Sequence, residues 1–185
     1  MPSPLIGLRV VDLSRHLPGP LTARLLADLG ARVIKIEEPR VGDPVRDAPP
    51  LLKGQSSLAA MLLAGVESVA LDLKNPAARG IAERLMGEAD ILLESFRPGT
   101  LARFGWAPEE LRRRYPKLVI CSISGWGQTG PLAKRAGHDL TYEAMAGLLA
   151  PLSPSIPPAA PLADLAGAWS ATTAILAALL ARART

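Results

Sequence analysis

The chain has 185 residues, of which 49% are apolar and 21% charged, so it can bury the core of one domain or slightly more, and general disorder is excluded. Its formal net charge of +4 is compatible with a small ligand that carries phosphate groups. The basic cluster at 111–117 is typical of a solvated helix face, and because no DNA- or RNA-recognition motif accompanies it, we expect no nucleic-acid partner.

Residues 8–37 predict a strand, a helix and a second strand in succession. The strands are the β-branched runs 8–14 and 31–37. A proline-containing turn leads from the first strand into a helix over 21–30, which ends at Gly30, a residue favoured just after a helix. A unit of this kind predicts two parallel strands joined by a right-handed crossover.

The same alternation continues along the chain. One later helix begins with an asparagine N-cap and a proline in its first turn, which is a typical helix start. This alternation predicts an α/β fold with a Rossmann-like, doubly wound, mainly parallel sheet and flanking helices. The remaining strands are expected over 68–74, 90–96 and 118–124, and the remaining helices of this part over 56–65, 75–89 and 107–116.

The sheet pattern stops after Gly130. Residues 140–150 are expected to form a helix. We therefore assign 1–150 to a large domain, and 151–185 to a proline-rich loop and a long helix that lead toward a second domain.

Three features indicate a cytoplasmic protein without membrane insertion. The long helix, expected over 163–184, contains an uncharged stretch at 165–181 that approaches a bilayer span in length, but its alanines, serine and threonines favour a buried core helix. Cys121 is the only cysteine, which excludes an internal disulfide and a cysteine-rich metal site and indicates a buried structural thiol. The first residues lack the pattern of a secretory signal.

Gly125, Gly127 and Gly130 spell G-x-G-x-x-G after the last predicted strand. A dinucleotide-binding fingerprint opens the first βα turn and leads into a helix. Here the motif follows the fifth strand and Pro131 comes directly after it. We therefore interpret 125–130 as a loop whose small residues let a ligand approach the backbone, and not as a nicotinamide or flavin site.

Several ordered blocks together resemble the class III coenzyme A transferases, a family whose members include α-methylacyl-CoA racemase. The resemblance implies a Rossmann-like domain that binds CoA thioesters, in homo-oligomers that are usually interlocked dimers. The blocks are "GLRVVDLSRHLPGPLTARLLADLGARVIKIEEP" (7–39), "GDPVR" (42–46), "SVALDLKNPAAR" (68–79), "ESFRPGTLARFGW" (94–106), "SISGWGQTGP" (122–131) and "AGHDLTYEAMAG" (136–147).

The resemblance implies a catalytic pair, Asp164 in "PLADLAGA" and His138 in "AGHDLTY". In transferases of the family the matching aspartate forms a mixed anhydride with the acyl group, whereas in racemases it carries a proton opposite a histidine. On its own, each residue would be an ordinary helix start or cap. Because His138 matches the racemase histidine, we expect an enzyme that epimerises the 2-methyl centre of an acyl-CoA by proton transfer through an enolate.

The pair suits that chemistry. Histidine titrates near neutrality, and burial raises the pKa of an aspartate toward that range. Backbone amides of 125–130, or at the helix start before Asp164, are candidates to stabilise the enolate oxygen. Two alternatives stay open: a CoA transferase that acts through an Asp164 anhydride, and a non-catalytic CoA-binding remnant.

The resemblance also implies a set of CoA contacts. Lys74 and Arg103 would supply charge for the phosphates, and Phe96 would flank the adenine or fill the core. Glu38 stands where some relatives have an arginine near the adenosine. We expect no metal and no cofactor other than the CoA of the substrate. The implied contact residues are His16, Leu17, Leu71, Lys74, Ser95, Phe96 and Arg103.

Members of this family are usually much longer, with a second domain that completes the site. We therefore expect either a homo-oligomer or a second polypeptide that supplies the missing part. The flank that such a part would cover should carry exposed apolar surface.

Overall fold

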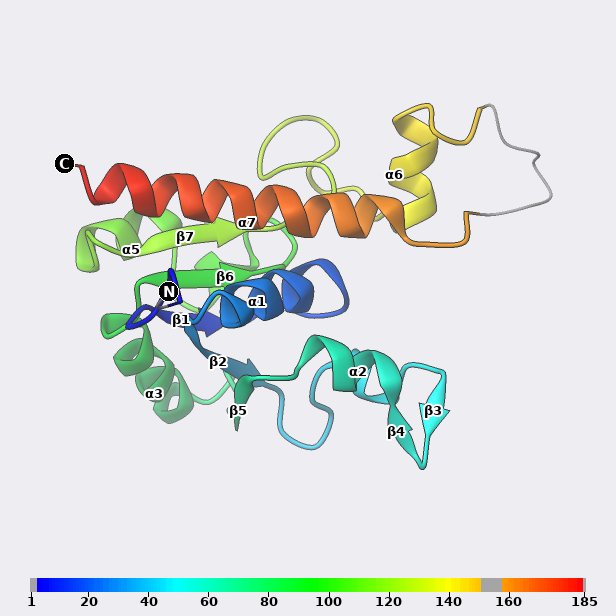
Figure 1. The fold of residues 1–185 in the computed structure, drawn as a ribbon. Coiled ribbons are helices and arrows are strands. Elements are labelled where there is room, and N and C mark those ends of the chain that lie inside the picture. The colour runs from blue at the N-terminus through cyan, green and yellow to red at the C-terminus, as the bar shows by residue number, and fades with distance from the viewer. Residues whose placement is uncertain (1–2, 151–157, 185) are drawn as a thin grey trace.

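The computed structural model describes residues 3–150 and 158–184, and its centre is a five-stranded sheet (Figure 1). The strand order is β5-β2-β1-β6-β7, and each neighbouring pair is parallel. The predicted α/β class with a mainly parallel sheet is therefore confirmed. The strands are β1 (Arg9–Asp12), β2 (Arg32–Glu37), β5 (Val66–Ala70), β6 (Ile91–Glu94) and β7 (Val119–Ser122).

Helices cover both faces of the sheet because successive side chains of each buried strand point to opposite faces. Val10 of β1 packs in one core cluster with Leu26 of α1 and Ile175 of α7, whereas its neighbour Val11 packs in a second cluster with Met86 of α3. The helices are α1 (Pro18–Asp28), α2 (Ser57–Leu62), α3 (Pro76–Gly87), α4 (Thr100–Arg103), α5 (Pro108–Arg114), α6 (Asp139–Met145) and α7 (Leu162–Arg182).

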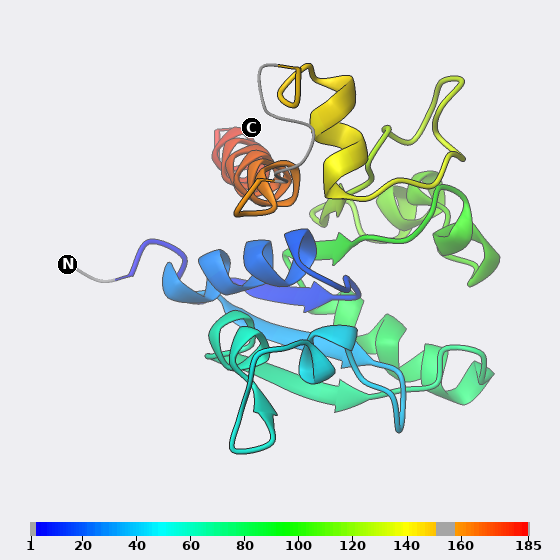
Figure 2. The same ribbon diagram turned by 90° about the vertical axis from the view of Figure 1, so that its right-hand side faces the viewer.

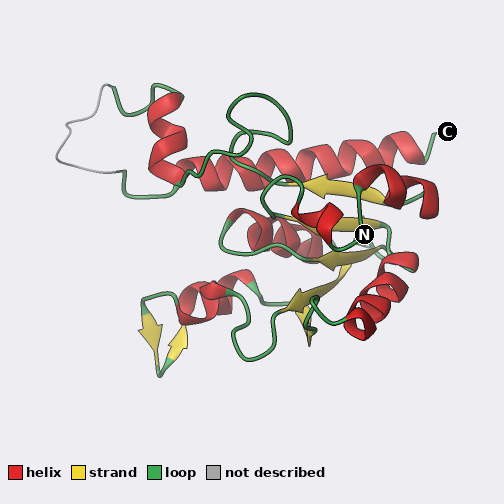
Figure 3. Ribbon diagram, turned by 180° about the vertical axis from the view of Figure 1, so that it is seen from behind, coloured by secondary structure: helices red, strands yellow, loops and turns green. Residues whose placement is uncertain are grey.

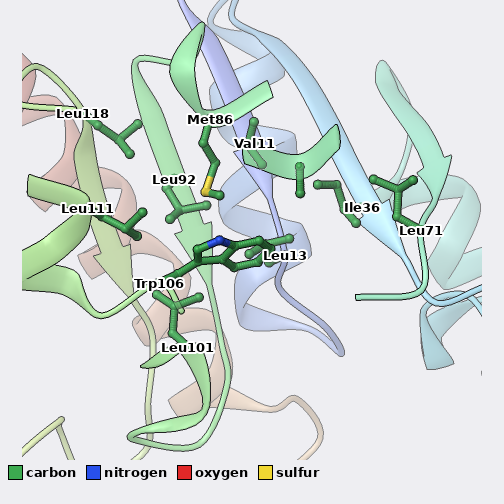
Figure 4. Packing of buried hydrophobic residues seen from close by; sticks show 11 residues of the cluster. Val11, Leu13, Ile36, Leu71, Met86, Leu92, Leu101, Trp106, Leu111 and Leu118 are labelled. Atoms are coloured by element: carbon green, nitrogen blue, oxygen red, sulfur yellow. The ribbon is translucent and has the colours of Figure 1, made fainter. Parts of the chain in front are cut away.

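Trp106 anchors the chain that follows β6. Its side chain is fully buried among Met86, Leu92 and their neighbours (Figure 4). The indole N–H donates a hydrogen bond of 2.9 Å to Oε1 of Glu83, so the one polar atom of this ring is satisfied. The anchored segment fixes the turn at the carboxyl end of β6, where part of the candidate site lies.

Helix α1 begins three residues earlier than the sequence pattern predicts. Pro18 and Pro20, which we interpreted as part of a turn, lie in its first turn. Proline is tolerated there because the N–H groups of the first turn have no partner within the helix. As a result, the first βα turn is short and places His16 just before the helix begins.

The long helix α7 covers one face of the sheet beside α1, which it contacts together with β7 (Figures 1 and 2). Although it is long and apolar enough by composition to cross a bilayer, it packs a stripe of residues onto this face. Our expectation of a buried core helix is wrong for its outer side, where Trp169 and Leu180 are 59% and 55% exposed. The buried stripe is Ala168, Ala171, Thr172, Ile175 and Leu179.

The region 40–67 contains structure that the sequence pattern did not predict. A 3₁₀ turn (Pro44–Asp47) is followed by an antiparallel hairpin of β3 (Leu51–Leu52) and β4 (Gln55–Ser56). The hairpin projects beside α2 (Figure 3). Strands this short give no readable alternation of apolar and polar residues.

Candidate active site

A cavity of about 650 Å³ opens at the carboxyl ends of β1, β6 and β7. The chain runs outward from β1 through β2 to β5, and then returns to β6 on the other side of β1. The strand order therefore reverses between β1 and β6, and such a switch point is where open α/β sheets bind their ligands. The loop 123–126, the loop 133–138 and the start of α7 complete the walls.

The first βα turn brings His16 to this cavity. His16 has a φ of +70°, a left-handed conformation that is costly for a residue with a side chain. Its backbone N–H donates to Oδ1 of Asp43 at 3.2 Å, and the neighbouring N–H of Arg15 donates to the Ser95 hydroxyl at 2.9 Å. Two distant segments therefore hold this turn in place.

Beneath the turn lies a buried ionic cluster centred on Lys35. Its ammonium nitrogen is 3.1 Å from Oδ2 of Asp12, 3.0 Å from Oδ2 of Asp43 and 2.5 Å from the carbonyl oxygen of Ser14. The lysine side chain is 1% exposed and both carboxylates are fully buried. Burial raises the pKa of Asp12, although the Lys35 charge and two hydrogen bonds from Ser14 oppose this effect. The cluster links β1, β2 and the "GDPVR" block to the turn that carries His16.

His138 and Asp164 both line this cavity, although they come from distant parts of the chain. His138 directly precedes α6, and Asp164 is the third residue of α7. Burial raises the pKa of the Asp164 carboxyl, the negative charge of Asp139 raises it further, and His138 and His16 lower it. Asp164 is therefore a carboxyl that holds its proton more tightly than usual, with two imidazoles nearby.

Tyr142 forms the wall next to His138. Its ring centroid is 4.9 Å from that of Trp126 in an edge-on arrangement, and its hydroxyl donates to the carbonyl oxygen of Gly137 at 2.9 Å. A Cβ on Gly125 would overlap the hydroxyl and ring of Tyr142. Of the three glycines in the G-x-G-x-x-G motif, Gly125 is the one that lines the cavity.

A Gly125→Ala substitution should therefore destabilise the protein by about 1–3 kcal/mol, as overpacking of a tight contact usually does. The near-UV circular dichroism of Trp126 and Tyr142 should change with it. Gly80→Ala is the matched control, because a Cβ on Gly80, within α3, meets no atom within 4 Å; it should stabilise the helix by up to about 1 kcal/mol. Urea unfolding measures both effects, and equal changes for the two variants would contradict the expected steric cause.

Of the other predicted contact residues, Ser95 and Phe96 line the cavity. Phe96 also packs against Phe104, with 5.9 Å between ring centroids, so it has a role in the core as well. Leu17, Leu71, Lys74 and Arg103 lie outside the cavity lining.

The cavity also contains basic residues that the sequence reasoning did not single out. Arg97, Lys134 and Arg135 line it and are exposed, and Arg15 lines it while paired with Glu38 at 2.9 Å. Their positions in the sequence could have indicated them, because Arg97 directly follows Phe96, and Lys134 and Arg135 precede His138 by four and three residues. Their charges suit an anionic ligand.

The backbone amides at the start of α7 are not free for an enolate oxygen, which corrects one of our expectations. The N–H of Leu162 donates to Glu143 at 3.1 Å and the N–H of Asp164 donates to Asp139 at 2.8 Å. Helix starts leave such groups unpaired, and here side chains of α6 satisfy them.

Cys121 lies outside this chemistry. Burial and the negative charge of Glu94 raise the pKa of its thiol to about 11. At neutral pH such a thiol is almost entirely protonated and therefore a poor nucleophile. The low reactivity agrees with its interpretation as a structural residue, but the residue is half-buried and not buried as we expected.

The arrangement defines an α/β protein with a cavity at the sheet's switch point that ionisable and aromatic side chains line. Comparison with known proteins gives the family. The family model "CoA-transferase family III" matches residues 5–185, so the chain belongs to this family. Over 146 residues it is 43% identical to acetyl-CoA:oxalate CoA-transferase of Acetobacter aceti, covering 79% of this chain and 38% of that protein. Over 148 residues it is 38% identical to human α-methylacyl-CoA racemase, covering 80% and 35%.

A solved structure shows the same fold. The CAIB/BAIF family protein from Brucella suis matches with a TM-score of 0.89 and 36% identity, covering 100% of this chain and 51% of that one. The chain thus spans about half the length of that structure and less than half of the curated relatives. Most of the similar curated proteins are named as CoA-transferases, together with the racemase.

Proposed function

We propose that the chain binds an acyl-CoA thioester and, alone or with a further polypeptide segment, epimerises its 2-methyl centre by proton transfer. One observation carries this proposal: His138 and Asp164 line a single cavity at the switch point of the sheet. Inversion next to a thioester carbonyl needs a base on one face of the carbon and an acid on the other. Two ionisable side chains, one at the N-cap of α6 and one in the first turn of α7, can supply these roles.

The proposed reaction moves one proton in and one proton out. One group of the pair removes the α-proton, the electron pair of the C–H bond enters the enolate, and the second group delivers a proton to the opposite face. A raised pKa makes the Asp164 carboxylate a stronger base than an ordinary aspartate, which favours proton removal from a weak carbon acid. The exposed cations Arg97, Lys134 and Arg135 would receive the CoA phosphates.

The test is hydrogen exchange. The purified protein is incubated with a 2-methylacyl-CoA in D₂O, and the α-proton signal is followed by NMR. We expect this signal to disappear while the thioester stays intact. An unchanged α-proton signal would exclude a racemase that is complete in this chain, and the same experiment on a co-expressed partner segment would then decide whether a second part is needed.

The names of the relatives favour a second candidate, a CoA transferase. In that reaction the Asp164 carboxylate attacks the thioester carbonyl, the C–S bond breaks, CoA leaves as the thiolate, and a mixed anhydride remains on the aspartate. Hydroxylamine should then trap an acyl group at Asp164, and a dicarboxylic acid such as oxalate should accept CoA. Binding of CoA without exchange, trapping or transfer would support a non-catalytic CoA-binding role.

A further inference from the structure

The junction between α6 and α7 is built from two carboxyl groups. Helix α6 lies against the beginning of α7 (Figures 1 and 2). Oε1 of Glu143 accepts the N–H of Leu162 at 3.1 Å, and Oδ1 of Asp139 accepts the N–H of Asp164 at 2.8 Å. Two side chains one turn apart on α6 therefore cap two of the N–H groups that begin α7.

The second oxygen of Glu143 is not explained by this capping. Glu143 is fully buried. Its Oε2 atom nevertheless has no hydrogen-bond partner among residues 3–150 and 158–184. Asp139 precedes Glu143 by four residues on α6, and both carboxyls cap the first turn of α7, so the two groups lie on the same side of α6 and face the same helix end. Two ionised carboxylates cannot donate to each other, so the contact is unfavourable unless one of them carries a proton.

We propose that Glu143 and Asp139 share one proton, with Glu143 as the neutral partner that donates to Asp139, and that the pair positions Asp164 for its chemistry. The proton converts a repulsive contact into an O–H···O⁻ hydrogen bond and satisfies the unpaired oxygen. Asp139 keeps its negative charge and holds the backbone of Asp164. The positioning of Asp164 for catalysis rests on the function proposed above for Asp164. The shared proton between Glu143 and Asp139 does not depend on that function.

The electrostatic surroundings agree with this arrangement. Burial and the neighbouring Asp139 raise the pKa of Glu143. Around Asp164, the ionisable groups are Asp139, His138 and Tyr142 from α6 and its start, and His16 from the first βα turn. Asp139 opposes the ionisation of Asp164 and the two histidines favour it. The charge on Asp139 is therefore the one whose removal should change the acidity of Asp164 most clearly.

Two isosteric variants separate the roles of the pair. In Glu143→Gln the side-chain amide can donate to Asp139 while its oxygen still caps α7, so we expect exchange activity within about 2-fold of the wild-type and an unchanged pH profile. In Asp139→Asn the negative charge is lost, so Asp164 should ionise more easily. The fall of the exchange rate on the acidic side of the pH profile should then move to lower pH by about one unit, the size of effect that a nearby like charge has. A purely structural cap would alter the rate or stability of both variants and leave the position of that limb unchanged, which would overturn the positioning role.

The shared proton has readouts that need no activity. Infrared spectroscopy of protein with ¹³C-labelled glutamate should show a protonated carboxyl band near neutral pH that is missing in Glu143→Gln. Because the folded-state pKa of Glu143 is raised, its protonation stabilises the fold fully below the usual glutamate pKa, and this stabilisation is lost as the pH rises through the folded value. The unfolding free energy of the wild-type should therefore fall relative to Glu143→Gln over that range.

The outcomes can be distinguished. If the wild-type shows the protonated band but no exchange of the substrate's α-proton, the shared proton is established and the proposed function fails. If neither the band nor the relative fall in unfolding free energy is found, the shared proton is refuted, whatever the activity.

Discussion

Replacing Lys35 by methionine should lower the free energy of unfolding by about 3–5 kcal/mol, the cost of removing one partner from a buried ion pair. Methionine has a similar length and fills the space of the lysine stem, so the change removes mainly the charge. Asp12 and Asp43 would then be left fully buried without their cation. The Ser14 carbonyl oxygen would also lose its ammonium donor.

The unfolding free energy that Lys35→Met loses should grow as the pH rises. Burial already raises the pKa of Asp12, and removal of the Lys35 charge, which opposes that rise, would raise it further. A carboxyl whose folded-state pKa lies above its unfolded value loses stabilisation as pH rises through the folded value. The difference between Lys35→Met and wild-type should therefore be larger at pH 8 than at pH 5.

Urea unfolding at these two pH values measures the effect. Lys117→Met is the matched control, because Lys117 is exposed and its backbone oxygen, which accepts from Arg182, is kept. It should change the unfolding free energy by less than about 0.5 kcal/mol. A similarly small change for Lys35→Met would show that the buried cluster does not stabilise the fold.

The strands and most helices of this fold could be predicted from the sequence because each carries a local signal. The apolar runs around Val10, Val33 and Leu92 are long enough to show buried strands. The prolines in the first turn of α1 misled the prediction of where this helix begins, since proline is typical both of turns and of a helix's first turn. The exposed outer side of α7 was missed because an alanine-rich helix shows little contrast between its two faces.

The candidate site could be predicted only in part. His138 and Asp164 were found through their motifs, and the structure places both at one cavity. The contacts that hold His16 and Asp164 at the cavity were not predictable, because they join segments distant in the chain. Asp43 accepts the N–H of His16, and Asp139 accepts the N–H of Asp164. A side chain that caps a helix 25 residues further along the chain, as Asp139 does for Asp164, leaves no periodic pattern from which a single sequence could predict it.

Asp164→Asn and His138→Gln should each lower the rate at which a 2-methylacyl-CoA is racemised by about 10²–10⁴-fold, the usual contribution of a positioned acid or base. Asparagine keeps the shape of the aspartate, and glutamine keeps a polar side chain, but neither can accept and return a proton at neutral pH. Because the two residues are proposed to serve opposite faces of the carbon, each variant should retain deuterium exchange of one epimer without inversion. The retained epimer should differ between the two variants.

Single epimers of the substrate in D₂O, followed by NMR and by chiral separation of the hydrolysed acids, provide this measurement. The exposed Asp47 lies outside the cavity lining, so Asp47→Asn should leave the exchange unchanged. At neutral pH, Asp164→Asn should unfold with a free energy equal to or above that of the wild-type, because a carboxyl with a raised pKa loses stabilisation once it ionises. A variant that is stable yet inactive would separate the chemical role of Asp164 from a structural one. Loss of exchange for the same epimer in both variants would instead mean that the pair acts as one base, and an inversion across two faces would need a second group.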